Sequence, residues 1–164
     1  FTYFAKAQLN QLVEKEIFAG LKDHVVTARL VSGIKDIGKN LKLSKNLSVD
    51  LPLVKIDNTA FSTIASNVFI NALIGLGEKG GEVKVVTRIK PKSDKIVELI
   101  IFDSGSGIPA NVQTKLFEPF NGKKTLGLGL SVVKKLLKEL GGEISIKSVP
   151  GKSTMVTMEF PIIK

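Results

Sequence analysis

The sequence predicts an α+β fold, a two-layer α/β sandwich in which helices cover one face of a mixed β-sheet. Two segments carry apolar residues at helical spacing, and four shorter segments are alternating or continuously apolar, as strands are. From residue 57 onward these segments follow the order helix, hairpin, helix, hairpin, and that order packs into two layers around one core. A chain of 164 residues is long enough for one such domain.

The first 56 residues carry the weaker signals. Residues 1–22 have apolar side chains close to helical spacing, which predicts a helix that either packs on the domain or leads in from an upstream one. These side chains are Leu9, Leu12, Val13 and Ile17. After them we expect a short helix across Leu30–Ile37 and strands around Leu47–Val49 and Leu53–Ile56.

The middle of the chain predicts a buried helix followed by a hairpin. Residues 57–59 supply N-cap side chains, and the apolar residues after them recur at three- and four-residue intervals. These are Phe61, Ile64, Ala65, Val68 and Ala72. A glycine pair at 80 and 81 ends the helix, residues 83–89 alternate as a strand, and Ile96–Phe102 is typical of a buried second strand.

The last part predicts a second helix and hairpin. Residues 103–109 are too rich in glycine for regular structure, and a short helix over Val112–Phe117 is expected after them. An amphipathic stripe follows over Leu130–Leu140 and stops at a glycine pair. Glu143–Ser148 and Thr154–Pro161 are the final two strands.

Composition excludes several kinds of chemistry. The absence of cysteine rules out disulfides, thiolate zinc sites and a cysteine nucleophile, and a single histidine argues against a multi-histidine metal centre. The formal charge is +9, and residues 121–164 hold eight lysines against three glutamates. Such a surplus favours a polyanion, either nucleic acid or the phosphates of a nucleotide.

Two features on the predicted elements point to a ligand. Asn67 and Asn71 lie four residues apart, so one helix face carries both amides; they either help to hold a hard cation such as Mg²⁺ or are solvated asparagines. Asp103-x-Gly105-x-Gly107 directly follows a buried strand. Its carboxylate can accept hydrogen bonds from a ring amine while the glycines let backbone approach a ligand, although a tight turn explains it equally well.

Two further features follow towards the C-terminus. Gly127-Leu128-Gly129-Leu130 opens the last helix after a loop with Lys123 and Lys124, and free N–H groups at a helix start bind anions. No Gly-Lys-Ser/Thr sequence follows, so this is not a Walker A loop, and a flexible hinge is the alternative. We interpret Phe117-Glu118-Pro119-Phe120 as an anchor of its loop to the core.

In this order the four features resemble the asparagine, glycine-rich and phenylalanine boxes of the catalytic ATP-binding domain of sensor histidine kinases. That family belongs to the GHKL group of ATPases, with gyrase, Hsp90 and MutL. The resemblance covers residues 24–164 and implies the Bergerat ATP-binding fold. It implies a catalytic ATP-binding domain at 23–164, and residues 1–22 would be the C-terminal end of a dimerisation helix or a linker.

The resemblance also implies a role for each matching position. Asn71 corresponds to the Mg²⁺-binding asparagine, and Asn67 lies one turn earlier near the phosphates; both count as catalytic. Asp103 corresponds to the carboxylate that binds the exocyclic amine of adenine, and Thr154 closes the adenine site. The ATP-binding set is Asn67, Asn71, Asp103, Gly105, Gly107, Ile108, Lys124, Gly127, Leu128, Gly129, Leu130 and Thr154. ATP and Mg²⁺ are the expected cofactors.

The sequence departs from the family pattern in three places, one of which is Thr125, where the family often has an extra glycine. The family usually has a basic residue three positions after the magnesium asparagine, often followed by an aromatic one, where this chain has Ile74 and Gly75. We therefore expect one phosphate contact to be missing or supplied by Lys79 or Lys124. The lid between Phe120 and Gly127 is only six residues long, and we expect it to leave the nucleotide exposed.

The resemblance implies transfer of the γ-phosphate of Mg²⁺-ATP to a histidine on a dimerisation domain outside this sequence, in a two-component sensor histidine kinase. His24 lacks the expected acceptor pattern and is interpreted as structural. The expected partners are that histidine-containing domain, a response regulator reached through the full-length kinase, and a second copy in a homodimer. No nucleic acid is expected. We expect a cytoplasmic domain of an inner-membrane sensor, with membrane contact only through segments outside this sequence.

Two other functions stay open at this point. One is a related GHKL protein serine kinase, and the other is a degenerate module that binds only a nucleotide or a partner. A clamp-type ATPase would have glutamate at the position of Asn67 to activate water, so this asparagine argues against hydrolysis.

Overall fold

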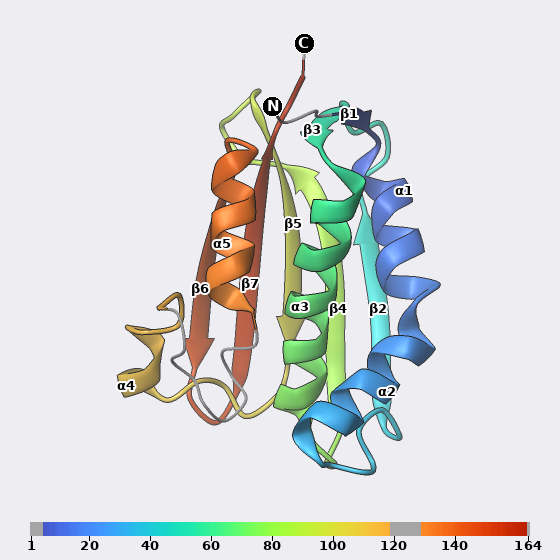
Figure 1. The fold of residues 1–164 in the computed structure, drawn as a ribbon, viewed down its shortest axis with the longest axis vertical. Coiled ribbons are helices and arrows are strands. Elements are labelled where there is room, and N and C mark those ends of the chain that lie inside the picture. The colour runs from blue at the N-terminus through green and yellow to red at the C-terminus, as the bar shows by residue number, and fades with distance from the viewer. Residues whose placement is uncertain (1–4, 119–128, 164) are drawn as a thin grey trace.

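The computed structural model describes residues 5–118 and 129–163 (Figure 1). Within these residues a five-stranded sheet has the order β2-β4-β5-β7-β6. Its strands are β2 (Leu41–Leu47), β4 (Gly81–Ile89), β5 (Ile96–Asp103), β6 (Glu143–Val149) and β7 (Ser153–Pro161). The pair β2–β4 is parallel and the other three pairs are antiparallel, so the sheet is mixed, as the sequence predicts.

Helices lie on one face of this sheet (Figure 1). They are α1 (Leu9–Val13), the π-helix η1 (Glu14–Phe18), α2 (Leu21–Ser32), α3 (Asn58–Leu76) and α5 (Leu130–Glu139), and the short α4 (Ala110–Gln113) lies beyond the end of β6. A second, antiparallel sheet of β1 (Ala5–Ala7) and β3 (Val54–Ile56) lies at the end where both chain termini are found. The predicted α+β sandwich is confirmed.

Strand alternation gives the sheet a buried face beneath the helices. The helix-facing side chains of β4, β5 and β7 are buried in register with one another; they include Val83, Val85, Leu99, Ile101, Val156, Met158 and Phe160. Helix α3 packs against them, and ten of its residues are buried. This helix is long and apolar enough to cross a membrane, but burial in the core accounts for its composition.

The helix ends follow the capping expected from the sequence. At the start of α3, Asp57 Oδ1 accepts a hydrogen bond from the Thr59 backbone N–H at 2.9 Å. At the end of α5, the Gly142 N–H donates to the Leu137 carbonyl at 2.7 Å and the Gly141 N–H donates to Lys138 at 3.0 Å. These two bonds form a Schellman motif that turns the chain into β6.

The predicted bounds differ most in the N-terminal third. The first helical segment begins at Leu9, and α2 continues to Ser32, so the helix predicted across Leu30–Ile37 is wrong. Gly33, with a φ of 75°, ends α2 instead. The strand predicted at Leu47–Val49 is also wrong because β2 ends at Leu47, while β3 falls within the predicted Leu53–Ile56. The short helix α4 starts two residues before the predicted Val112–Phe117 and ends at Gln113.

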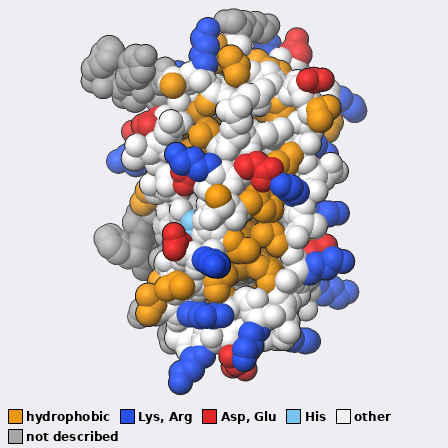
Figure 2. Space-filling view, turned by 90° about the vertical axis from the view of Figure 1, so that its right-hand side faces the viewer, with side chains coloured by type: hydrophobic (Ala, Val, Ile, Leu, Met, Phe, Trp, Pro, Cys, Tyr) orange, Lys and Arg blue, Asp and Glu red, His pale blue; other side chains and the backbone are white. Residues whose placement is uncertain are grey.

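The side of the molecule formed by α1, α2 and β2 carries a patch of hydrophobic side chains, with lysines and arginines more numerous than acidic residues around it (Figure 2). On the elements of this side, Lys45 of β2 pairs with Glu14 at 2.7 Å and lies 4.8 Å from the centre of the Phe18 ring. These contacts hold the edge strand against η1.

The first helical segment packs on the domain. Leu9, Val13 and Ile17 are fully buried within the main hydrophobic cluster, together with residues of α3. Of the two arrangements expected for this segment, the structure has the packed one. That residues 1–22 form the end of a dimerisation helix or a linker stays a prediction.

Replacing one buried and one exposed leucine tests this packing. We expect Leu9→Ala to lower the free energy of unfolding by about 2–5 kcal/mol, because it leaves a cavity in the core. Leu30→Ala removes the same atoms from a side chain that is 79% exposed, so we expect a change within about 0.5 kcal/mol. Urea unfolding of both variants measures the difference, and equally small effects would contradict the packing of this segment.

Candidate functional site

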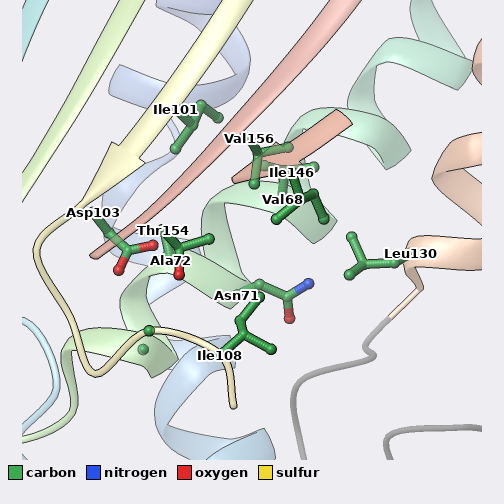
Figure 3. A pocket seen from close by; sticks show the side chains of 12 residues that line it. Val68, Asn71, Ala72, Ile101, Asp103, Ile108, Leu130, Ile146, Thr154 and Val156 are labelled. Carbon is green, nitrogen blue, oxygen red and sulfur yellow. The ribbon is translucent and has the colours of Figure 1, made fainter. Parts of the chain in front are cut away.

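The site lies where β5 ends and β7 begins, beneath the helix layer (Figure 3). Asp103 is the last residue of β5 and pairs in register with Thr154 of β7. Alternation along both strands directs the two side chains to the helix-facing side, where Asp103 is 5% exposed and Thr154 8% exposed. A carboxylate and a hydroxyl are thus brought together in an otherwise apolar layer.

A pocket is bounded by this pair, by α3 and by the start of α5. Six residues of the predicted set line it: Asn71, Asp103, Gly107, Ile108, Leu130 and Thr154. The others that line it were not predicted as site residues: Val68, Ala72, Gly75, Ile101, Ile146 and Val156. Their strand and helix spacing indicates core residues, and no sequence signal separates a core position from the floor of a pocket. The result is an apolar slot with polar groups at its rim, which suits a flat aromatic ring.

The loop after β5 is fixed by backbone hydrogen bonds on two sides. The Ser106 N–H donates to the Gly75 carbonyl of α3 at 3.1 Å, and the Gly151 N–H of the β6–β7 turn donates to Ser106 at 2.6 Å. Gly107 has a φ of 71°, and a Cβ there would lie 2.3 Å from the Val149 carbonyl oxygen. Only glycine fits so close to the end of β6, and this explains Gly107 in the Asp103-x-Gly105-x-Gly107 pattern.

Ser148, which was not predicted as a site residue, supports the wall of the pocket through its hydroxyl group. Ser148 Oγ accepts the Ile108 N–H at 2.8 Å and donates its proton to the Ser153 carbonyl at 2.8 Å. Because that proton is used, the hydrogen bond between Ser148 and Thr154, 3.0 Å long, has the Thr154 hydroxyl as its donor. The remaining lone pairs of Thr154 therefore act as acceptors towards a ligand.

Burial sets the electrostatics of Asp103. Desolvation raises the pKa of its carboxyl group to about 6, and the hydrogen bond that Oδ1 accepts from the Gly105 N–H at 2.9 Å offsets part of that rise. The pocket thus holds a carboxylate that is ionised at neutral pH but incompletely hydrated. A ligand that donates an N–H group would replace the missing water.

The opposite end of the pocket carries amide groups and a helix start. The side-chain oxygen of Asn71 is buried there. Asn67, one turn earlier on α3, and Gly129, the N-cap of α5, do not themselves line the pocket; they pack on each other so closely that a Cβ on the glycine would lie 2.7 Å from the Asn67 Cγ. The free N–H groups at the start of a helix favour an anion here.

The remaining predicted residues fall in different places. Gly105 does not line this pocket; it acts through its hydrogen bond to Asp103 and lines a neighbouring cavity with Lys79. The structure therefore does not bring Lys79 together with Asn71. Lys124, Gly127 and Leu128 lie outside the described residues, as does the predicted lid at 121–126.

The single histidine is structural, as the sequence indicates. The Nε2 atom of His24 lies 2.6 Å from the Glu16 carbonyl oxygen, and its ring packs edge-on against Phe69 with a centroid distance of 5.5 Å. His24 does not line the pocket. Phe117, from the phenylalanine box, packs against Lys134 at 4.8 Å, in agreement with its expected role as an anchor.

An α/β sandwich with a buried hydrogen-bond acceptor at one end of an apolar slot and the start of a helix at the other is typical of a nucleotide-binding domain. The comparison with known families agrees. Residues 56–164 match the model of the "Histidine kinase-, DNA gyrase B-, and HSP90-like ATPase" family, and the chain belongs to this family.

Curated relatives and solved structures show which members of the family this chain resembles. The chain is 35% identical over 141 residues to the sensor kinase CckA of Brucella abortus, a match that covers 76% of this chain and 15% of that protein. Its fold is similar to the catalytic domain of histidine kinase ThkA, with a TM-score of 0.77 at 23% identity, over 98% of this chain and 99% of that one. ThkA in complex with the response regulator protein TrrA matches with a TM-score of 0.73 at 22% identity, over 98% of this chain and 42% of that one.

These similarities support an ATP-binding catalytic domain of the sensor histidine kinase type. The chain spans 10–15% of the length of the first curated relatives that it matches.

The raised pKa of Asp103 predicts how the free energy of unfolding depends on pH. The native state holds the Asp103 proton more tightly than an unfolded chain, so the wild type gains stability as the pH falls from about 6 towards 3.8. Asp103→Asn removes the charge, and we expect it to raise the free energy of unfolding at pH 7 by at most about 3 kcal/mol, the equivalent of a shift of about two pKa units. Urea unfolding at pH 7 and pH 4 measures this, and the gain is expected to vanish at the lower pH. A variant less stable than the wild type at pH 7 would contradict this account.

Proposed function

We propose that this domain binds Mg²⁺-ATP and transfers the γ-phosphoryl group to a histidine on a dimerisation domain outside this sequence. One observation carries the proposal: a buried carboxylate, a hydroxyl acceptor, a helix-borne asparagine and the start of α5 all border one apolar pocket. The similarity to sensor kinases supports the histidine acceptor over the serine kinase alternative.

Adenine fits the end of the pocket beside β5 and β7. Its exocyclic amine donates to Asp103, and the ring lies between the apolar side chains of α3 and those of the sheet. Thr154 offers acceptor lone pairs next to the carboxylate, directly or through a water molecule. Guanine carries a carbonyl oxygen where adenine carries the amine, so the carboxylate would repel it. The pocket therefore selects adenine by the direction of one hydrogen bond.

The triphosphate fits the end formed by Asn71, Asn67 and the first turn of α5. Backbone N–H groups there would stabilise phosphate oxygens, and no described residue that lines the pocket is basic, in keeping with the apolar Ile74 at the family's basic position. Within residues 5–118 and 129–163, no group of three His, Cys, Asp or Glu side chains is placed to hold a metal ion. The buried amide oxygen of Asn71 suits Mg²⁺ that takes its other ligands from phosphate and water, and the ion would supply charge neutralisation.

The chain's part in the transfer is to bind and orient the nucleotide. A neutral imidazole attacks phosphorus with its own lone pair, so no strong base is needed in this domain. His24 is unsuited to be the acceptor because it is 9% exposed and bound to the Glu16 carbonyl. The acceptor histidine would be presented by the dimerisation domain of a homodimeric kinase.

The proposed setting is a two-component pathway. ThkA, a structural neighbour, is found in complex with a response regulator, and this supports a response regulator as the downstream partner of the full-length kinase. Because the relatives are sensor kinases, we assign the domain to the cytoplasmic part of a sensor, which other segments would attach to the inner membrane.

Calorimetric titration with a non-hydrolysable ATP analogue tests the magnesium assignment. We expect tighter binding with Mg²⁺ than without it, and we expect Asn71→Ala to lose at least about tenfold in affinity, or 1.4 kcal/mol, only when Mg²⁺ is present. Asn58→Ala is the matched control because Asn58 lies exposed at the start of the same helix. Equal losses with and without Mg²⁺ would remove Asn71 from its role as a ligand.

A base-selectivity measurement tests Asp103. We expect Asp103→Asn to weaken ATP binding by about ten- to a hundredfold, because a charged acceptor is worth about 1.5–3 kcal/mol. GTP binding should not weaken in parallel, since the new amide can donate to the guanine oxygen. Unfolding cannot explain such a loss, because the same variant is expected to be more stable at pH 7. An unchanged ratio of ATP to GTP affinity would contradict the assignment.

A further inference from the structure

The hydroxyl group of Ser148 connects β6 to the pocket through three hydrogen bonds. Its oxygen lies 2.8 Å from the Ile108 backbone nitrogen, 2.8 Å from the Ser153 carbonyl oxygen and 3.0 Å from the Thr154 hydroxyl oxygen. A serine hydroxyl has one proton and two lone pairs, so these three partners use its whole hydrogen-bonding capacity. Ile108 and Thr154 line the pocket, whereas Ser148 lies behind them.

The two backbone partners fix the direction of all three hydrogen bonds. The Ile108 N–H can only donate and the Ser153 carbonyl can only accept, so the Ser148 proton lies on the bond to the carbonyl. The Thr154 proton must then lie between the two hydroxyl oxygens, because oxygens 3.0 Å apart without a proton between them repel each other. Ser148 thus holds Thr154 as an acceptor towards the pocket.

Thr154 lies beside a second acceptor. It pairs in register with Asp103 of the neighbouring antiparallel strand, and side chains paired in this way have Cβ atoms about 4.5–5.5 Å apart. Figure 3 shows both side chains at the same end of the pocket. Because the Thr154 proton is directed to Ser148, it does not neutralise the neighbouring carboxylate. The two side chains therefore present acceptors and no donor to a ligand.

We propose that Ser148 is a positioning residue for base selection: by accepting the Thr154 proton, it makes the pocket favour a base with an amine over one with a carbonyl at the same ring position. The two protons of the adenine amine suit two acceptors, whereas the carbonyl oxygen of hypoxanthine would face both of them. A water molecule between Asp103 and Thr154 leaves this preference unchanged, since it donates its protons to them and turns its lone pairs to the ligand. The inference rests on the proposed function, because it takes the ligand to be a purine nucleotide.

Calorimetric titration with ATP and ITP, whose bases carry an amine and a carbonyl at the same ring position, measures this selection. We expect Ser148→Ala to lower the ratio of the ITP to the ATP dissociation constant by about tenfold, or 1.4 kcal/mol, because the freed Thr154 hydroxyl can rotate and donate to the carbonyl. The ratio cancels losses common to both nucleotides, such as those caused by the released Ile108 N–H.

Two variants on the same strand are the controls. Ser148→Thr keeps the hydroxyl group and is expected to keep the wild-type ratio. Ser145→Ala removes the hydroxyl of an exposed serine of β6 and should also leave the ratio unchanged. If Ser148→Ala weakens both nucleotides equally, Ser148 only supports the wall of the pocket and the inference is overturned.

A double-mutant cycle shows whether Ser148 acts through Thr154. Thr154→Val removes the second acceptor, so we expect the ratio to fall, and adding Ser148→Ala should lower it no further because no hydroxyl is left to redirect. A further tenfold fall would contradict the inference. If Ser148→Ala does not fold, Thr154→Val decides, and an unchanged ratio overturns the inference. A wild-type chain that binds neither nucleotide contradicts the proposed function itself, whereas one that binds ATP and ITP equally contradicts only base selection.

Discussion

The antiparallel pairing of β5 with β7 is the constraint on which the site depends. It places Asp103 opposite Thr154, and because alternation runs uninterrupted along both strands, the same parity that buries Leu99 and Met158 directs these two polar groups into the helix layer. A slip of one residue in this register would expose the whole apolar set and turn the carboxylate to the open face. The register that forms the hydrophobic core therefore also forms the end of the pocket at which we propose that the base binds, and neither can be changed without the other.

The buried carboxylate of Asp103 lowers the stability of the fold, and hydrogen bonds of the loop after β5 hold it in place. Burial raises its pKa, and the Gly105 N–H compensates only in part. The loop that carries this N–H is hydrogen-bonded to α3 through Ser106 and to β6 through Ser148. These hydrogen bonds outside the pocket offset the free-energy cost of burying the charge. The unsatisfied part of the carboxylate remains available to a ligand. Binding energy at this end comes from relieving a cost that folding has already imposed.

The sequence predicts the second half of the fold well because its periodicities agree with its turn residues. It fails at β2, where Lys45 stands at a helix-facing position of an edge strand; the contacts with Glu14 and Phe18 that make a lysine acceptable there come from residues far away in the chain. The polar and glycine positions of the site follow from spacing and from the family resemblance. The apolar floor, exemplified by Val68 and Val156, does not, since a residue that packs against a ligand has the same pattern as one that packs against the core. Ser148 is missed because its importance lies in hydrogen bonds across β6 and β7.

The structure requires glycine at Gly129 but not at Gly75. At the phosphate end, Gly129 has a φ of 70° and lies against Asn67, so both the backbone and the packing require glycine. At the end beside Asp103, Gly75 meets neither restriction, because its φ is not positive and a Cβ there would make ordinary van der Waals contacts with the Asp103 carboxyl group. In the proposed function, phosphate recognition therefore depends on backbone geometry at a position that requires glycine, whereas base recognition depends on the side chain of Asp103.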